Sequence, residues 1–474
     1  MSATTTTNNS KKRSLPLQTE IEVKPKFAVV AAVQLSSVSD IEFEASLTEL
    51  RELAKTLGYK VIRTFTQKRA AFDSVAYLGT GKLKEIRRYV GNELDDDGAG
   101  EAESNETTPV TAPDDRATEV IDALLVDHDI SPSQARNLEN EVGCEVMDRT
   151  MVILEIFHRN ARSRAARAQV EIARLGYMAP RLREMAKLVG PQGRQRSGTG
   201  GRGAGESHTE LDKRKLRDRI AELNQEIIAM DVERTTQRAR RQERQGLNHV
   251  AIVGYTNAGK STLMRALTGS EVLVANKLFA TLDTTVRALH PETVPRVLIS
   301  DTVGFIKNLP HGLVASFKST LDEALDASLL LHVIDASDPG FERQLLVTDE
   351  VLGEIDAATV PKIRVFNKID HVGGAVAQVE RAAALRAQYP DCVVMSAHRA
   401  EDVAALHKTI VAFFQRDLVE AELFLTWSQQ QLRGKIYASC EVVAERAEAE
   451  GAYFSVRGEP ATVESLREQI GQAV

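Results

Sequence analysis

Several features that mark other protein classes are scarce or absent in this chain. Its 474 residues hold three cysteines, Cys144, Cys392 and Cys440, far apart and without metal-ligand spacing. They are therefore expected to be free thiols in a reducing compartment. No segment is long and apolar enough to cross a bilayer, and the Thr- and Asn-rich first ten residues lack the apolar core of a secretory signal. These absences predict a soluble, cytoplasmic protein.

The net charge of −7 is unevenly distributed along the chain. Residues 159–244 carry 21 Lys and Arg against 11 Asp and Glu, a basic segment in an otherwise acidic protein. Residues 92–119 contain ten acids and one Arg among Gly, Ser, Thr and Pro, which predicts a disordered acidic loop without chemistry of its own. Residues 1–24 are also predicted to be disordered. The basic segment is the more informative of these features, because it favours a negatively charged partner.

Strand and helix patterns alternate through the first part of the chain. We predict strands at 27–33, 60–65 and 121–126, a short strand ending near Leu78, and helices at 42–57 and 82–90. Ser131-Pro132 is typical of a helix start, with Pro at the first helical position. Such alternation predicts an N-terminal α/β domain over 25–150 with a mostly parallel sheet.

A helical hairpin is predicted over 151–246, followed by two further units. Apolar residues recur at steps of three and four at Ala165, Ala168, Ile172, Leu175, Ala179, Leu182, Ala186 and Val189, and again at Leu216, Ile220, Leu223, Ile227 and Met230. The Gly- and Arg-rich loop 190–207 joins the two helices, so an antiparallel coiled-coil hairpin is expected, kinked at Pro180. Residues 247–417 again alternate strand and helix. Residues 418–474 predict a small α+β domain with strands at 423–427 and 452–456 and helices at 435–449 and 463–470.

Residues 254–261, GYTNAGKS, fit the pattern of a phosphate-binding loop. An apolar run at 249–253 predicts a strand before the loop, and 262–267 predicts a helix after it. Glycines let backbone amides approach phosphates, and the helix N-terminus adds a positive dipole. Lys260 is expected to reach the β- and γ-phosphates. The predicted contacts of this loop are Gly254, Tyr255, Thr256, Asn257, Ala258, Gly259, Lys260, Ser261 and Thr262.

Two later segments supply the switch elements of a GTPase. Thr281 is expected to close over the γ-phosphate, and its neighbours Phe279, Ala280, Leu282 and Asp283 are predicted to line the nucleotide. Asp301-Thr302-Val303-Gly304 follows an apolar strand at 297–299, and the Gly304 amide would contact the γ-phosphate. The predicted catalytic residues are Thr281, Gly304 and Lys260. The predicted Mg²⁺ ligands are Ser261, Thr281 and, through water, Asp301.

The base is predicted from Asn367-Lys368-Ile369-Asp370, at the end of a strand over 362–366. The Asp370 carboxylate can accept from guanine N1–H and the N2 amine together. Adenine has an acceptor at N1 and no amine at C2, so it would leave that carboxylate unpaired. Ser396-Ala397-His398 follows a strand at 392–395 and should support guanine O6. Because ligands in such sheets bind outside the carboxyl ends of the strands, GTP is favoured over ATP.

Two positions suggest how hydrolysis is controlled. Many regulatory GTPases carry Gln directly after Asp-x-x-Gly to orient the attacking water, but this chain has Phe305, which cannot hydrogen-bond to water. Hydrolysis is therefore predicted to be slow until a partner reorders the switch segments. Asn257 can help to coordinate K⁺ beside the phosphates, which would supply part of an arginine finger's charge. The alternative, that Asn257 only stabilises the loop, is equally supported by the residue type.

The segments GYTNAGKSTL, LFATLD, DTVGFI, LPHGLVASFKSTLDEAL and NKID closely resemble the HflX family of ribosome-associated GTPases. SPSQARNLE, DRTMVILEIFHRNAR and GRGAGES, outside the GTPase domain, are also similar to that family. The resemblance implies an N-terminal α/β domain, a helical hairpin, a GTPase domain and a small C-terminal domain. It also implies GTP-dependent splitting or rescue of stalled ribosomes. The chain departs from the family pattern at Thr284 and Ala204, where Pro is usual, and at Gly201, where Thr is usual.

The resemblance implies partners as well as activity. GTP and GDP are expected ligands, and the hairpin loop is expected to face RNA of the large ribosomal subunit through Arg194, Arg196 and Arg202, which can contact phosphates without reading sequence. DNA is not an expected partner, a monomer is expected, and peripheral membrane association is left open. The alternative function is a signalling GTPase whose hairpin binds a protein partner at a membrane or complex.

Overall fold

A computed structural model describes residues 25–91, 119–188, 208–245, 248–269, 278–279, 282, 284–294, 296–307, 323–416 and 418–471. Several predictions lie outside these residues. They concern the tail 1–24, nearly all of the acidic loop 92–119, the hairpin loop 190–207 with its three arginines, and the switch residues Ala280, Thr281 and Asp283.

The N-terminal unit is a parallel sheet covered by helices on both faces. Its strands, in spatial order β2-β1-β3-β4, are β2 (Tyr59–Arg69), β1 (Lys26–Leu35), β3 (Ala123–Val126) and β4 (Glu145–Asp148). Its helices are α1 (Asp40–Thr56), α2 (Thr80–Val90), α3 (Pro132–Val142) and α4 (Arg149–Asn160). α3 begins as predicted, because Ser131 and Gln134 form a reciprocal capping box ahead of Pro132. The parallel α/β prediction is confirmed.

One predicted strand of this unit is wrong. The residues before Leu78 form only an isolated bridge between Asp73 and Tyr77. The Asp73 carboxylate accepts hydrogen bonds from the Val75 and Ala76 amides at 2.9 and 3.1 Å, so the chain turns back where a strand would continue.

α4 packs into the core of the N-terminal unit. Val152, Ile153 and Phe157 are fully buried against α1 residues such as Leu47 and Leu50. The predicted boundary between 150 and 151 would separate this helix from the sheet that it covers. We therefore place α4 with the N-terminal unit.

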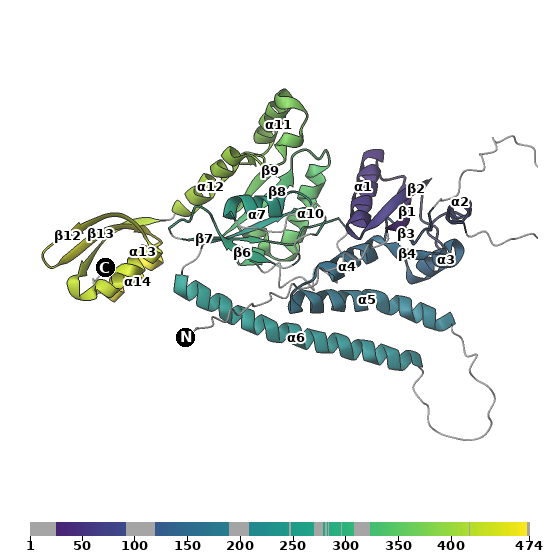
Figure 1. The fold of residues 1–474 in the computed structure, drawn as a ribbon, viewed down its shortest axis with the longest axis horizontal. Coiled ribbons are helices and arrows are strands. Elements are labelled where there is room, and N and C mark those ends of the chain that lie inside the picture. Colours follow the sequence, from purple (N-terminus) through teal and green to yellow (C-terminus); the bar gives the residue numbers. More distant parts are fainter. Residues whose placement is uncertain are drawn as a thin grey trace, which may run out of the picture.

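The helical hairpin consists of α5 (Arg164–Leu188) and α6 (His208–Gln245), and α5 continues through Pro180. Ion pairs join Glu171 to Arg219 at 3.0 Å and Arg164 to Glu226 at 3.4 Å. Partner numbers rise on one helix as they fall on the other, so the helices are antiparallel, as predicted. Figure 1 shows them side by side. The predicted seam residues among those whose burial is described are buried or half-buried.

The GTPase domain is a six-stranded sheet in the order β10-β9-β8-β5-β7-β6. The strands are β10 (Val393–Val394), β9 (Lys362–Asn367), β8 (Leu329–Asp335), β5 (Asn248–Gly254), β7 (Val297–Asp301) and β6 (Thr285–Ala288). The helices are α7 (Lys260–Thr268), α10 (Phe341–Glu354), α11 (Gly374–Gln388) and α12 (Ala400–Gln415), with short 3₁₀ turns at Ala357–Thr359 and Ile369–His371. The sheet is parallel except for the edge strand β6, which pairs antiparallel with β7.

The C-terminal unit is an antiparallel sheet in the order β11-β13-β12, formed by Val419–Thr426, Gly451–Gly458 and Glu441–Ala447. Its helices are a 3₁₀ turn at Trp427–Leu432, α13 (Arg433–Ser439) and α14 (Pro460–Ile470). The predicted helix over 435–449 is wrong, because α13 ends at Ser439 and β12 begins two residues later. Pairing of β12 with β13 outweighs the helix propensity of its Ala and Glu residues.

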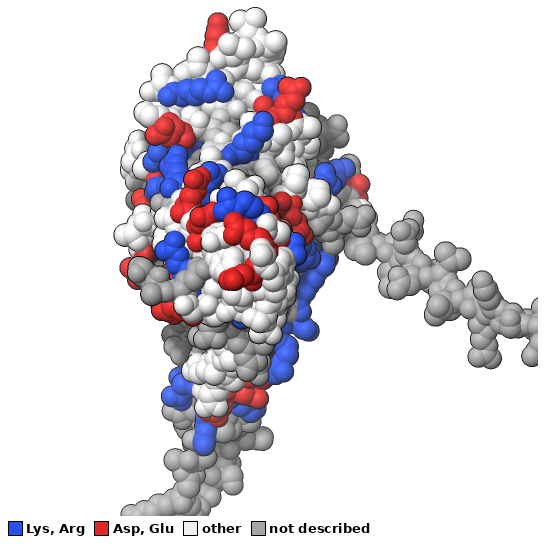
Figure 2. Space-filling view, turned by 90° about the vertical axis from the view of Figure 1, so that its left-hand side faces the viewer, with Lys and Arg blue, Asp and Glu red and all other residues white. Residues whose placement is uncertain are grey.

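These units are arranged along one axis, with the N-terminal and C-terminal units on either side of the GTPase domain (Figure 1). In Figure 2 the end that carries the C-terminal unit faces the viewer. Acidic and basic side chains are interleaved over it, so the described surface there has no patch of a single sign. No helix among the described residues is long and apolar enough to cross a membrane.

Candidate nucleotide-binding site

The phosphate-loop residues link β5 to α7, as predicted. Gly254 has a φ of +145°, and a Cβ there would lie 2.2 Å from the Val333 carbonyl oxygen. Gly259 has a φ of +94°, and its Cβ would lie 2.3 Å from Asn367 Nδ2. Only glycine fits at these two positions, because both the backbone conformation and the adjacent atoms exclude a side chain.

Lys260 is buried at the start of α7. Its ammonium donates to the carbonyl oxygens of Gly254 at 3.0 Å and Tyr255 at 2.7 Å. Burial lowers the pKa of Lys260 to about 8, while the nearby Asp301 carboxylate acts in the opposite direction. The ammonium is therefore held within the loop, where phosphate oxygens would restore the favourable charge interactions that burial removes.

The predicted magnesium and γ-phosphate residues converge on the same place. Ser261 Oγ donates to Asp301 Oδ2 at 2.7 Å, so a hydroxyl and a carboxylate meet at the end of β7. Gly304 lies against Lys260 and Thr256, since a Cβ there would be 2.9 Å from Lys260 Nζ and 3.1 Å from Thr256 Cα. Thr302 is buried, and its hydroxyl donates to the Ile252 carbonyl at 2.7 Å, which makes it a structural link between strands.

The predicted base-recognition residues also lie together. Asn367 is buried and joins two loops, because its amide donates to the Ala258 carbonyl at 3.0 Å and accepts from the Ala397 amide at 2.9 Å. Lys368 pairs with Asp335 at 2.8 Å. The Asp370 pKa is lowered overall: burial raises it, and a hydrogen bond from Ser396 is the largest opposing contribution.

The first switch segment contacts the N-terminal unit where it is described. The Leu278 amide donates to Thr56 Oγ1 at 3.2 Å, and Asn160 Nδ2 donates to the Phe279 carbonyl at 2.8 Å. The Phe279 ring lies 4.5 Å, centroid to centroid, from that of Phe157 and is buried. Any nucleotide contact by Phe279 must therefore use its backbone.

The second switch segment is paired with the phosphate loop. The Thr256 amide donates to the Phe305 carbonyl at 2.7 Å, and the Phe305 amide donates to the Gly254 carbonyl at 3.1 Å. The Lys307 amide donates to the Tyr255 phenol oxygen at 2.8 Å. The Phe305 side chain is directed into the core, where the residue is 1 % exposed. It cannot take the place of a water-orienting Gln.

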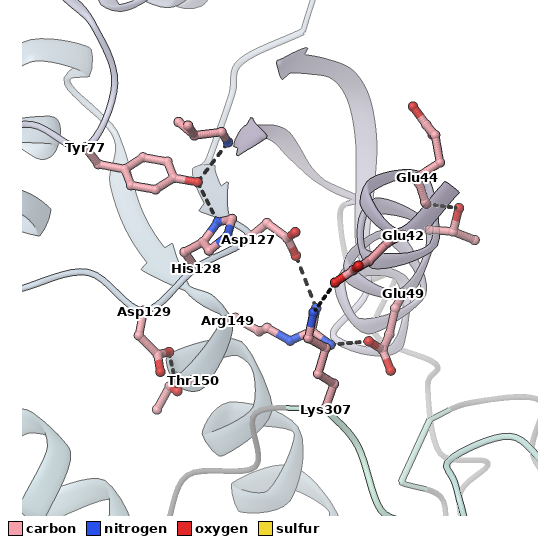
Figure 3. Close-up of polar contacts among 12 residues, drawn as sticks. Glu42, Glu44, Glu49, Tyr77, Asp127, His128, Asp129, Arg149, Thr150 and Lys307 are labelled. Carbon is pink, nitrogen blue, oxygen red and sulfur yellow. Dashed lines mark hydrogen bonds and ion pairs between the residues drawn. The ribbon is translucent and has the colours of Figure 1, made fainter. Parts of the chain in front are cut away.

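A polar cluster in the N-terminal unit was not predicted from the sequence. Figure 3 shows Arg149, at the start of α4, between Asp127, which follows β3, and Glu49 of α1. The Tyr77 phenol, the His128 ring and the Val33 amide form a second set of contacts beside it. These residues come from segments up to about a hundred positions apart, so no local pattern could have identified the cluster.

A cleft of about 1020 Å³ separates α1 from the GTPase domain. Its walls include Glu42 and Glu49 on one side and Tyr255, Asn257 and Lys307 on the other. Lys307 Nζ lies 3.5 Å from the Glu42 carboxylate, and Arg343 also pairs with Glu42. The phosphate loop therefore faces the N-terminal unit across this cleft.

Family models match three successive parts of the chain. They are described as "GTP-binding GTPase N-terminal" over 44–97 and 110–158, "GTP-binding GTPase Middle Region" over 160–241, and "50S ribosome-binding GTPase" over 249–368. A GTPase HflX of Gluconacetobacter diazotrophicus is 49% identical over 468 residues, which cover 95% of this chain and 99% of that protein. The chain belongs to the HflX family of GTPases.

Other HflX relatives extend the match. The GTPase HflX of Escherichia coli is 34% identical over 90% of this chain and 91% of its own. Among solved structures, a GTP-binding protein of Sulfolobus solfataricus in complex with GDP is 23% identical, with a TM-score of 0.42, and covers 81% of this chain and 99% of that one. Family membership confirms the predicted GTP hydrolase and fits the ribosome-associated function rather than the signalling alternative.

Proposed function

We propose that this GTPase binds the large ribosomal subunit and uses the GTP cycle to split or rescue stalled ribosomes. The observation that carries the proposal is the match of residues 249–368 to the model for 50S ribosome-binding GTPases. The basic charge of residues 159–244 supports RNA contact through the hairpin. Arg194, Arg196 and Arg202 are proposed as contacts on sequence grounds, because they lie outside the described residues.

The proposed nucleotide contacts are the predicted ones, Gly254 to Thr262, Phe279 to Asp283, Asp301 to Gly304, Asn367 to Asp370 and Ser396 to His398. Asp370 supports guanine, because its Oδ1 is buried without a hydrogen-bond partner among the described residues. The N1–H of guanine would supply that partner, whereas adenine has no hydrogen there. Lys260 would hold the β- and γ-phosphates.

Ser261, Asp301 and Thr281 are proposed to hold Mg²⁺. The hydroxyl and carboxylate oxygens of Ser261 and Asp301, 2.7 Å apart, are the ligand type that Mg²⁺ prefers. When bound, the ion would neutralise charge on the β- and γ-phosphates. Thr281 lies outside the described residues, and its part rests on the sequence.

K⁺ beside the phosphates is proposed as a second cation, held in part by Asn257. Asn257 has a backbone φ of 59° and lines the cleft next to the phosphate loop. GTP turnover should then be faster in K⁺ than in Na⁺ at equal ionic strength, and Asn257→Ala should remove the difference. Equal rates in the two salts would exclude this role.

Hydrolysis is proposed to depend on the ribosome, because the buried Phe305 stands where many regulatory GTPases carry a Gln that orients water. Turnover should rise when large subunits are added to the purified protein. The same rate with and without subunits would contradict this dependence.

The binding test is co-sedimentation with large subunits in the presence of a non-hydrolysable GTP analogue. Replacement of Arg194, Arg196 and Arg202 by Ala should weaken binding and reduce its salt dependence. A matched control replaces three exposed cations on other helices, Lys84 of α2, Arg386 of α11 and Lys408 of α12. Equal binding by the wild type, the loop variant and the control would exclude the hairpin loop as the RNA contact.

Oligomeric state and location remain proposals. We propose a cytoplasmic monomer, and peripheral membrane association is left open. Light scattering of the full chain would test the first part, and flotation with vesicles of anionic lipid would test the second.

A further inference from the structure

Glu49 lies on α1 of the N-terminal unit, yet its carboxylate contacts the phosphate loop. The Tyr255 phenol donates to Glu49 Oε1 at 2.7 Å. Tyr255 is the second residue of the GYTNAGKS loop, and only 8 % of its surface is exposed. A side chain from a different unit therefore binds directly to a residue next to the phosphate site.

The direction of each hydrogen bond in this contact is determined. The Lys307 amide can only donate, so the Tyr255 oxygen accepts from it at 2.8 Å. The single phenolic proton is then left for Glu49. Burial, reinforced by the Glu49 charge, raises the pKa of Tyr255, so the phenol keeps this proton. The order is therefore Lys307 N–H to Tyr255 O–H to the Glu49 carboxylate.

Glu49 is itself held in place by Arg149. The Arg149 side chain is 3 % exposed and pairs with both Glu49 and Asp127, the latter at 3.1 Å. Figure 3 shows Glu49 directed from α1 toward the guanidinium. Because a buried ion pair keeps its partners in defined geometry, Glu49 is a fixed acceptor rather than a mobile surface carboxylate.

Lys307 is the last described residue of the second switch segment and is held from two sides. Its amide is bound through Tyr255, and its ammonium lies 3.5 Å from Glu42, also on α1. The same segment contains Gly304, which lies against Lys260. A displacement of Lys307 would therefore move the amide that we expect to contact the γ-phosphate.

We propose that Glu49 is a positioning residue for GTP hydrolysis, which acts through the Tyr255 phenol to hold the segment from Asp301 to Lys307 against the phosphate loop. The proposal rests on the GTPase activity and on the role of Gly304, and it is independent of ribosome binding. Glu49 does not touch the nucleotide in this account. Its effect is on the geometry of the switch segment.

The test measures GTP turnover without ribosomes by Glu49→Ala, Tyr255→Phe and the double variant. We expect kcat to fall about tenfold in each, with KM for GTP within about twofold, because the main binding contacts remain while the γ-phosphate contact is displaced. The double variant should lose no more than either single variant, since both remove the same link.

Glu49→Gln supplies the conservative comparison. Its amide oxygen can still accept from the phenol, but it loses the ion pair with Arg149, so kcat should lie between that of Glu49→Ala and that of the wild type. Glu44→Ala is the matched control, because Glu44 is exposed on the same helix and Figure 3 shows it directed away from Arg149. Its kcat should equal that of the wild type. Thermal unfolding of each variant identifies those that fail to fold.

Two results would overturn the proposal. One is an unchanged or increased kcat in folded Tyr255→Phe and Glu49→Ala. The other is additive losses in the double variant, which would mean that Glu49 acts by another route. A failure of ribosome binding leaves these measurements unaffected, because they use the protein alone.

Discussion

Nucleotide binding should be accompanied by proton uptake near pH 8, because of Lys260. The ammonium is buried, and burial lowers its pKa to about 8 from the usual 10.5 of a lysine. When nucleotide binds, its phosphate oxygens lie beside the Lys260 ammonium and favour the charged form. A lysine that is partly neutral before binding should therefore be fully protonated afterwards.

The magnitude follows from the pKa. At pH 8 about half of the nucleotide-free molecules hold a neutral Lys260, so binding should take up about 0.5 proton per nucleotide, and about 0.1 at pH 7. The same lowered pKa makes the free energy of unfolding depend on pH. Between pH 8 and 10.5 the folded protein binds fewer protons than the unfolded chain, so nucleotide-free stability rises with pH there. Below pH 8 the burial of the charged Lys260 lowers the free energy of unfolding by its full amount, about 3 kcal/mol.

The assay is isothermal titration calorimetry of GDP binding in buffers with different ionisation enthalpies. The slope of observed enthalpy against buffer ionisation enthalpy gives the number of protons taken up. Lys260→Arg is the control, because a guanidinium stays protonated and should abolish the uptake even if binding is weaker. A slope of zero or of opposite sign at pH 8 in the wild type would refute the reasoning.

Three further predictions concern other parts of the chain. Gly259→Ala should abolish GTP binding measured by fluorescent nucleotide titration, because its Cβ would lie 2.3 Å from Asn367 Nδ2 at a φ of +94°; binding within about threefold of the wild type would contradict this. Asp370→Asn should weaken GTP binding at least about a hundredfold and improve binding of xanthosine triphosphate, whose C2 oxygen accepts from an amide; unchanged preference would exclude Asp370 as the base contact. Phe454→Ala should destabilise the C-terminal unit by about 3–5 kcal/mol in denaturant titrations, since Phe454 is 1 % exposed, and leave turnover without ribosomes unchanged; a parallel loss of turnover would be evidence of coupling.

Periodic and short-range patterns were sufficient for most of the fold. The phosphate loop was predicted because strand, glycine turn and helix are adjacent in the chain, and α3 was predicted because its cap lies within four residues. The prediction over 435–449 was wrong because local propensity favoured a helix where β12 pairs with β13. The edge strand β6 was missed because its pairing with β7 is a tertiary contact.

The functional prediction succeeded for a similar reason. Lys260, Asp301 and Asp370 each belong to a short motif, and each motif ends a strand of one sheet, so sequence order alone implied that they converge. The burial of Phe279 against Phe157 was not predictable, because these residues belong to different units and only their packing brings them together.

The sequence by itself predicted the GTPase activity, because the proposed phosphate and guanine contacts are consecutive residues whose spacing is visible in the chain. It also determined the antiparallel hairpin, whose seam repeats every three and four residues. Only the tertiary structure decided that Glu49 reaches Tyr255 and that Arg149 holds it there. The physical reason is that burial of charged groups requires partners, and those partners come from whichever distant elements the packed core places beside them.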